Sequence, residues 1–169
     1  MLLSKQERLI LFNQYEILKN INPDNEKEYK NYQEILSSGY TENYCNFTAI
    51  INEPTPKEVQ KFVYKVLDMF RGLNDSYIQL SDADKSQIKF EDIIYQGFDG
   101  NEEGEYYMYA NFLLESLGLY AESYTNSKHQ LNSHCNKVST YSKMIKLWDT
   151  IADKFSMDLE NIKNLIAIN

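Results

Sequence analysis

The spacing of apolar residues between prolines and glycines is the feature that most restricts this fold. Apolar side chains recur every three or four residues along most of the chain, and no convincing alternation of period two appears. That spacing places side chains on one face of an α-helix. Pro23 and Pro56 stand where helices are expected to begin, and Gly39 stands where one is expected to end. The sequence therefore predicts an all-α fold, a compact multihelical single domain over residues 1–169 with about six or seven helices.

The clearest predicted helix covers residues 55–80. Thr55 is suited to cap it, Pro56 occupies the first helical position, and Glu58 supplies an acid in the first turn. The apolar residues that follow repeat at helical spacing: Val59, Phe62, Val63, Val66, Phe70, Leu73 and Tyr77.

A first helix is predicted from Ser4, where Glu7 completes a capping box, to residues 20–22. Its apolar residues form one stripe, with Gln14 in the middle: Leu3, Ile10, Leu11, Ile17, Leu18 and Ile21. A buried amide without partners costs about 1–3 kcal/mol. We therefore expect Gln14 either to bond backbone groups of a neighbouring helix or to face a small polar pocket.

Further helices are expected over residues 22–39, 101–121 and 137–154, and from Ser156 or Asp158 toward the end. Residues 41–51 are ambiguous, with a short helix preferred over a strand. Residues 81–96 form a linker with room for a helical turn, and residues 122–136 a long loop. The 101–121 helix is apolar on most faces, which is typical of a central helix or one between subunits.

The charge balance argues against direct nucleic-acid binding. The net charge is −8, and only Arg8 and Arg71 could make bidentate phosphate contacts. Like-charged copies would repel unless they met through an apolar surface, so we expect any dimer face to be rich in aromatic residues.

No stretch of sequence has the character of a membrane span or a secretory signal. Cys45 and Cys135 are far apart in sequence. A single disulfide between them is one alternative, but two cysteines do not form a dense disulfide framework. We expect a cytoplasmic protein.

Several residues invite a chemical interpretation. His129, His134 and Cys135 lie close in sequence, but no second pair of ligands completes a zinc site, so neither metal nor cofactor is expected. Residues 97–101 contain two glycines but lack the lysine of a phosphate-binding loop. We interpret them as a turn in which Asp99 caps the next helix and Glu102 completes the box.

An ordered set of residues resembles the YfbU family along nearly the whole chain. The set comprises Arg8 to Leu11 and Asn13 to Tyr15; Ile35 to Tyr40; Gly97, Phe98, Asp99, Glu103, Tyr106, Tyr109, Phe112, Gly118 and Tyr120; and His129, Asn132, Tyr141, Met144 and Trp148. The resemblance implies a multihelical homo-oligomer and supplies no catalytic residues. Relatives joined to a helix-turn-helix segment suggest a ligand-sensing or interaction role.

Three functional hypotheses follow. The first is a regulatory module that binds a small molecule or a protein partner as a homo-oligomer, through polar residues that recur in the family signatures: Arg8, Gln14, Asp99, Glu103, His129 and Asn132. The second is a hydrolase-type enzyme in which Asp99 or Glu103 works with His129. The third is that these residues only cap helices and hold the fold.

Overall fold

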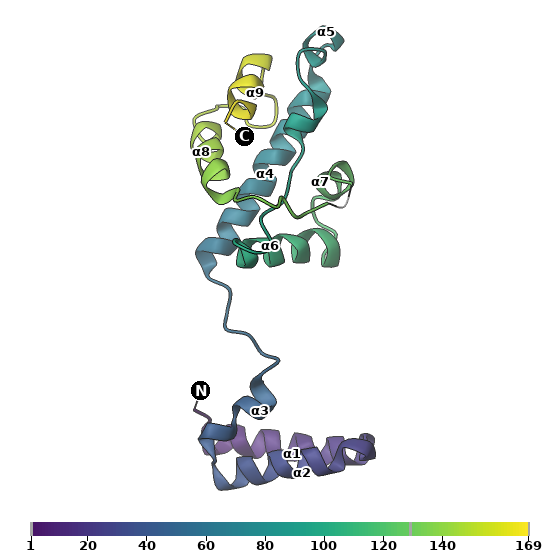
Figure 1. The fold of residues 1–169 in the computed structure, drawn as a ribbon, viewed down its shortest axis with the longest axis vertical. Helices are drawn as coiled ribbons and strands as arrows, with labels where there is room; N and C mark the ends of the chain where they lie inside the picture. The colour runs from purple at the N-terminus through teal and green to yellow at the C-terminus, as the bar shows by residue number, and fades with distance from the viewer. Residues whose placement is uncertain (1, 129, 169) are drawn as a thin grey trace. The chain divides into compact units, whose positions relative to one another are not determined.

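A computed structural model describes residues 2–128 and 130–168, and every regular element in these ranges is helical (Figure 1). This confirms the all-α prediction. The described part contains nine α-helices rather than six or seven, because several are too short to show a periodicity in sequence. Contacts divide the chain into two compact units, Met1–Pro54 and Thr55–Asn169. A single domain over residues 1–169 stays a prediction.

The first unit is built on a helical hairpin. Its elements are α1 (Lys5–Ile21), a 3-10 turn (Pro23–Asn25), α2 (Glu26–Ser38), a second 3-10 turn (Thr41–Asn43) and α3 (Cys45–Thr48). The predicted capping box is present: Ser4 Oγ accepts from Glu7 N at 3.2 Å, and Ser4 N donates to Glu7 Oε2 at 2.7 Å. Gly39 ends α2 with φ of 72°, the left-handed conformation that glycine adopts without strain.

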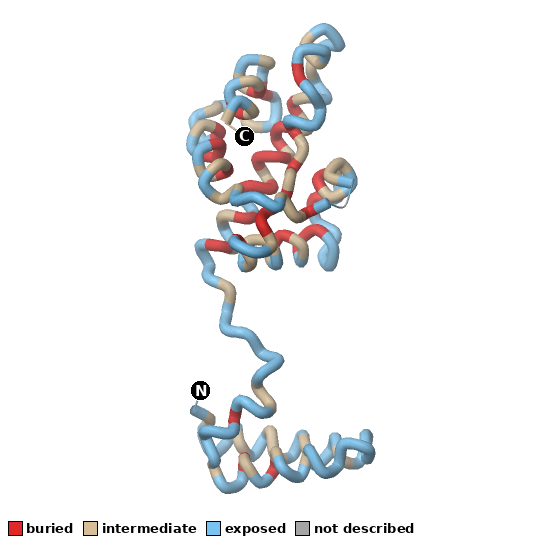
Figure 2. Tube along the Cα trace, in the orientation of Figure 1, coloured by how far each residue is buried: buried red, intermediate tan, exposed pale blue. Residues whose placement is uncertain are grey.

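The contact between α1 and α2 is thinly buried. None of the residues of α1 is buried, and the described part of this unit buries only Gln33, Leu36 and Tyr44 (Figure 2). Gln33 Nε2 donates to Phe12 O at 3.2 Å and to Glu16 Oε2 at 2.9 Å, which ties the two helices together. Four aromatic rings meet beside this contact: Tyr15 stacks on Tyr29 and lies tilted against Tyr32, and Tyr32 meets Phe47 edge-on.

In the second unit, the long helix α4 (Lys57–Gln79) carries the core. It contacts α6, α7, α8 and α9 (Figure 1). The other elements are α5 (Asp82–Lys85), a 3-10 turn (Phe90–Ile93), α6 (Gly104–Asn111), a π-helical turn (Phe112–Ser116), α7 (Ala121–Asn126), α8 (Val138–Trp148) and α9 (Leu159–Ile166).

The apolar face predicted for residues 55–80 is the buried face of α4. Val63, Val66, Leu67, Met69 and Leu73 are wholly enclosed. The predicted cap is wrong, because Pro56 holds the cap position and no side chain bonds the first turn. Thr55 contributes its carbonyl instead, which accepts from Gln60 Nε2 at 2.8 Å.

Aromatic rings fill the centre of this core. Tyr95 and Tyr141 each meet Phe70 edge-on, at centroid distances of 5.5 and 5.3 Å. Trp148 lies at the end of α8, nearly buried, with Phe155 edge-on at 6.3 Å and Lys154 Nζ 4.5 Å from its ring centre. The backbone of Lys154 approaches α4 so closely that a Cβ at Gly72 would lie 2.4 Å from its carbonyl oxygen.

Three predicted boundaries in this unit differ from the structure. The 101–121 helix begins at Gly104 and passes into a π-helical turn at residue 112. Part of the predicted 122–136 loop is α7, which is too short for its periodicity to stand out. The helix expected to reach residue 154 ends at Trp148, because the chain turns there to bring Lys154 against α4.

Candidate functional site

Two segments distant in sequence meet at the polar residues predicted for the second unit. Phe98 and Asn132 form an isolated parallel bridge, and Ser133 N donates to Phe98 O at 3.1 Å. Gly97, with φ of 87°, makes this approach feasible, since a Cβ there would lie 1.8 Å from Leu131 O. The bridge brings Asp99, Glu103 and Asn132 into one polar network.

Glu103 is the centre of this network. Its side chain is nearly buried, at 8% exposure. Oε2 accepts from Asp99 N at 3.1 Å, and Oε1 accepts from Lys137 N at 2.8 Å and Val138 N at 2.6 Å. The carboxylate thus binds the amides at the start of α8, where a negative charge is favourable.

Asp99 and Asn132 complete the network with backbone contacts. Asp99 Oδ1 accepts from Asn101 N at 2.8 Å and Glu102 N at 3.2 Å. Asn132 Oδ1 accepts from Gly100 N at 3.2 Å and His134 N at 2.9 Å. The predicted cap is wrong: Glu103 holds the cap position of α6, and no side chain caps that helix. Asp99 instead bonds the amides of the turn before α6, and Glu103 rather than Glu102 bonds the Asp99 amide. These contacts are those expected of residues that hold the fold.

The two candidates in the first unit lie apart from each other. Arg8 Nη1 donates to Leu36 O at 2.9 Å, where it satisfies a carbonyl in the last turn of α2. Gln14 is exposed, which contradicts its predicted burial. The prediction failed because α1 turns the side with Phe12 and Tyr15 toward α2, so that of the predicted stripe within α1 only Leu11 is half-buried. The sixth candidate, His129, lies outside the described residues.

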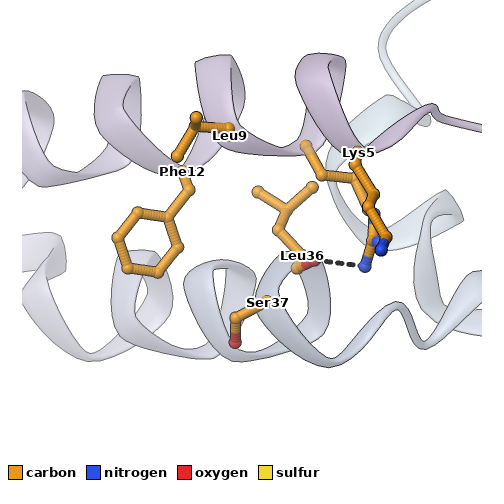
Figure 3. Close-up of a pocket in the computed structure, with 6 residues that line it drawn as sticks. Lys5, Leu9, Phe12, Leu36 and Ser37 are labelled. Atoms are coloured by element: carbon orange, nitrogen blue, oxygen red, sulfur yellow. Dashed lines mark hydrogen bonds between the residues drawn. The ribbon is translucent and has the colours of Figure 1, made fainter.

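The first unit therefore presents apolar residues to solvent. A groove of about 390 Å³ runs between α1 and α2, lined by Lys5, Arg8, Leu9, Phe12, Leu36 and Ser37 (Figure 3). A shallower hollow is lined by Gln14, Ile17 and Leu18. We call the exposed row Ile10, Gln14, Ile17, Leu18 and Ile21 the α1 stripe; Ile10, Ile17 and Ile21 are 57%, 59% and 72% exposed.

The second unit has a polar cleft that the sequence analysis missed. Its volume is about 400 Å³, and it is lined by Tyr107, Asn111, Glu115, Gln130, Leu131, Asn132 and His134. One lining residue, Asn111, has a buried Oδ1 without a hydrogen-bond partner among the described residues. The spacing of Tyr107, Asn111 and Glu115, four residues apart, was the signal available, but it was obscured by the apolar residues around it.

A further cluster joins α4 to α7. Arg71 Nε donates to Glu122 Oε1 at 2.6 Å, and its guanidinium lies 4.0 Å from the ring centre of Tyr120. Tyr120 donates to Asp68 Oδ1 at 2.6 Å. Burial, and then the Asp68 carboxylate, raise the pKa of the Tyr120 hydroxyl. These contacts fix α7 on the core.

Within residues 2–128 and 130–168, no group of three histidine, cysteine or acidic side chains is placed to hold a metal ion. Cys45 and Cys135 are both free thiols at the surface. Over the same ranges, no helix combines the length and apolarity needed to cross a bilayer.

A family model described as the YfbU domain matches residues 1–167. The chain belongs to the YfbU family. A UPF0304 protein of Methanocaldococcus jannaschii is 32% identical over 168 residues, which cover 98% of this chain and 99% of that protein. The YfbU match runs through both units.

Proposed function

We propose that this YfbU chain is a regulatory protein-interaction module that acts as a homo-oligomer. The observation that carries the proposal is the α1 stripe, whose isoleucines are more than half exposed. Contiguous exposed apolar faces of this kind mark sites of association. Covering each of these side chains would contribute on the order of 1 kcal/mol to the free energy of association.

The small core of the first unit supports the same proposal. Short helices draw most of their stability from packing of an amphipathic face, and α1 and α2 bury little against each other. An association that covered the α1 stripe would supply the burial that this hairpin lacks.

The test is the mass of the full chain in solution. Light scattering after size exclusion, over about 1–100 μM chain, should give a multiple of the monomer mass that falls on dilution. A monomer throughout this range would contradict the proposed homo-oligomer.

The polar cleft favours a second candidate function, the binding of a small ligand that carries an amino group. The buried Asn111 Oδ1 needs a hydrogen-bond donor, and Glu115 adds a carboxylate to the same cleft. Asn132 lines the same cleft, whereas Asp99 and Glu103 do not line it and would support it through their backbone contacts.

Thermal shift with a panel of primary amines tests this candidate. Saturation at about 100 times the dissociation constant should stabilise the wild type by about 2.7 kcal/mol and leave Asn111→Ala unshifted. No shift in the wild type, or an equal shift in the variant, would count against the cleft.

A further inference from the structure

We infer that the α1 stripe packs against the α1 stripe of a second copy of this chain, as an antiparallel pair with its two-fold axis beside Gln14. The inference rests on the proposed homo-oligomer and specifies which surface forms it. It replaces the aromatic-rich face expected from the sequence with an aliphatic one.

The spacing of the stripe is that of a helix seam. Ile10, Gln14, Ile17 and Ile21 are separated by four, three and four residues, which is the repeat that lets two helices pack along their length. Phe12 and Tyr15, half-buried, occupy the other side of α1, and half-buried Leu11 lies at the edge of the stripe. A second hairpin laid on the stripe would complete a four-helix bundle.

Gln14 explains why the partner is a copy of this chain. Its exposed amide has no hydrogen-bond partner within the described residues, and it lies near the middle of α1. An amide carries both a donor and an acceptor, so two of them related by a two-fold axis satisfy each other. A single polar residue in an apolar seam fixes register in this way.

The flanking residues fit an antiparallel arrangement. Ile10 precedes Gln14 by four residues and Leu18 follows it by four, about 6 Å away on each side. A two-fold axis at Gln14 therefore sets Ile10 of one copy opposite Leu18 of the other, Ile17 opposite Leu11, and Ile21 opposite Glu7 at the edge of the contact. The antiparallel direction also opposes the two helix dipoles.

Charge and anchoring distinguish the α1 stripe from other exposed apolar residues. The stripe contains no charged side chain, so copies of a chain with net charge −8 meet there without direct repulsion. Met108 and Phe112 are also exposed, but their helix is already anchored by Ala110, Leu113 and Leu114. No residue of α1 is buried, so α1 would gain more stability than that helix from a partner that covers its apolar side chains.

Disulfide trapping tests the geometry in a full chain carrying Cys45→Ser and Cys135→Ser, since both native thiols are exposed. Gln14→Cys should form linked dimers with itself, and Ile10→Cys should link to Leu18→Cys in a mixture. Ile10→Cys alone should not link, because its copies would lie about 12 Å apart, beyond the roughly 7 Å reach of a disulfide. Met108→Cys is the matched control and should stay unlinked.

Two substitutions test the energetics. Ile17→Lys should weaken association by about 100-fold or more, since it places like charges in the seam, while Phe112→Lys should leave it unchanged. Gln14→Leu should tighten association, because a polar residue in a seam lowers its stability. Circular dichroism would confirm that each variant keeps its helices.

The outcomes separate this inference from the proposed function. A dimer that survives Ile17→Lys and is lost in Phe112→Lys, or that links through Met108→Cys, leaves the homo-oligomer standing and overturns the α1 pairing. Self-linking of Ile10→Cys overturns the antiparallel arrangement. If the chain is a monomer and the thiol of Ile17→Cys resists labelling, another part of the same chain covers α1. That result would contradict both proposals.

Discussion

Glu103 shows at the scale of one residue how a side chain suited to catalysis can be committed to the fold. Its two oxygens accept from three backbone amides that belong to the 97–103 turn and the start of α8. Glu103→Ala would leave these amides unpaired and should lower the free energy of unfolding by about 3 kcal/mol or more. Urea denaturation measures the change.

Glu105→Ala, on an exposed side chain two residues away, is the matched control and should stay within about 0.5 kcal/mol. A loss in Glu103→Ala no larger than in this control would contradict the structural role.

Two buried tyrosines of the core differ in one hydrogen bond. Tyr141 Oη donates to Gly97 O at 3.0 Å, whereas Tyr95 Oη has no partner among the described residues. Tyr141→Phe should therefore lower the free energy of unfolding by about 1 kcal/mol. Tyr95→Phe should be neutral or stabilise by about 1 kcal/mol, because it removes an unpaired polar group. Equal losses in the two variants would show that a solvent molecule serves Tyr95.

At the scale of elements, the approach of the 97–103 turn to residues 131–133 depends on Gly97. Gly97→Ala would place a methyl group on Leu131 O at a backbone angle that alanine rarely adopts. We expect the free energy of unfolding to fall by about 3 kcal/mol or more. The bridge between Phe98 and Asn132 should also be lost.

Gly104→Ala is the matched control, because a Cβ there meets nothing within 4 Å. It should be neutral or stabilising by about 0.5 kcal/mol, since alanine restricts the unfolded chain. Thermal melts of both variants measure the difference. A Gly97→Ala variant with the same melting temperature as the wild type would contradict the prediction.

Helix ends were predictable where a local side chain decides them. Ser4 and Asp158 cap α1 and α9, and Gly39 ends α2, as their chemistry indicates. The burial of α1 was not predictable, because an apolar stripe shows which residues need cover but not which element covers them. The meeting of Glu103 with Val138 was equally hidden, since it depends on a bridge between segments distant in sequence.

At the scale of the molecule, buried tyrosines should limit stability in alkali. Burial raises the pKa of Tyr95, Tyr120 and Tyr141 above the usual value for tyrosine. A raised pKa in the folded state gives stability that is complete below the unfolded pKa, about 10, and is lost as pH rises above it. The free energy of unfolding should therefore fall above about pH 10.

Urea denaturation at about pH 8 and pH 10.5 measures this fall, which Tyr95→Phe should reduce. Tyr40→Phe, on an exposed ring, should leave the fall unchanged. Equal falls in both variants would show that the core tyrosines do not cause it.

The position of Trp148 gives the chain an internal reporter. It is the only tryptophan in the sequence, and it is enclosed in the second unit beneath Lys154. Its fluorescence therefore follows the melting of the α4 core, whereas the helical signal of the whole chain comes from both units. Comparing its emission with that helical signal would reveal whether the two units melt together or in separate steps.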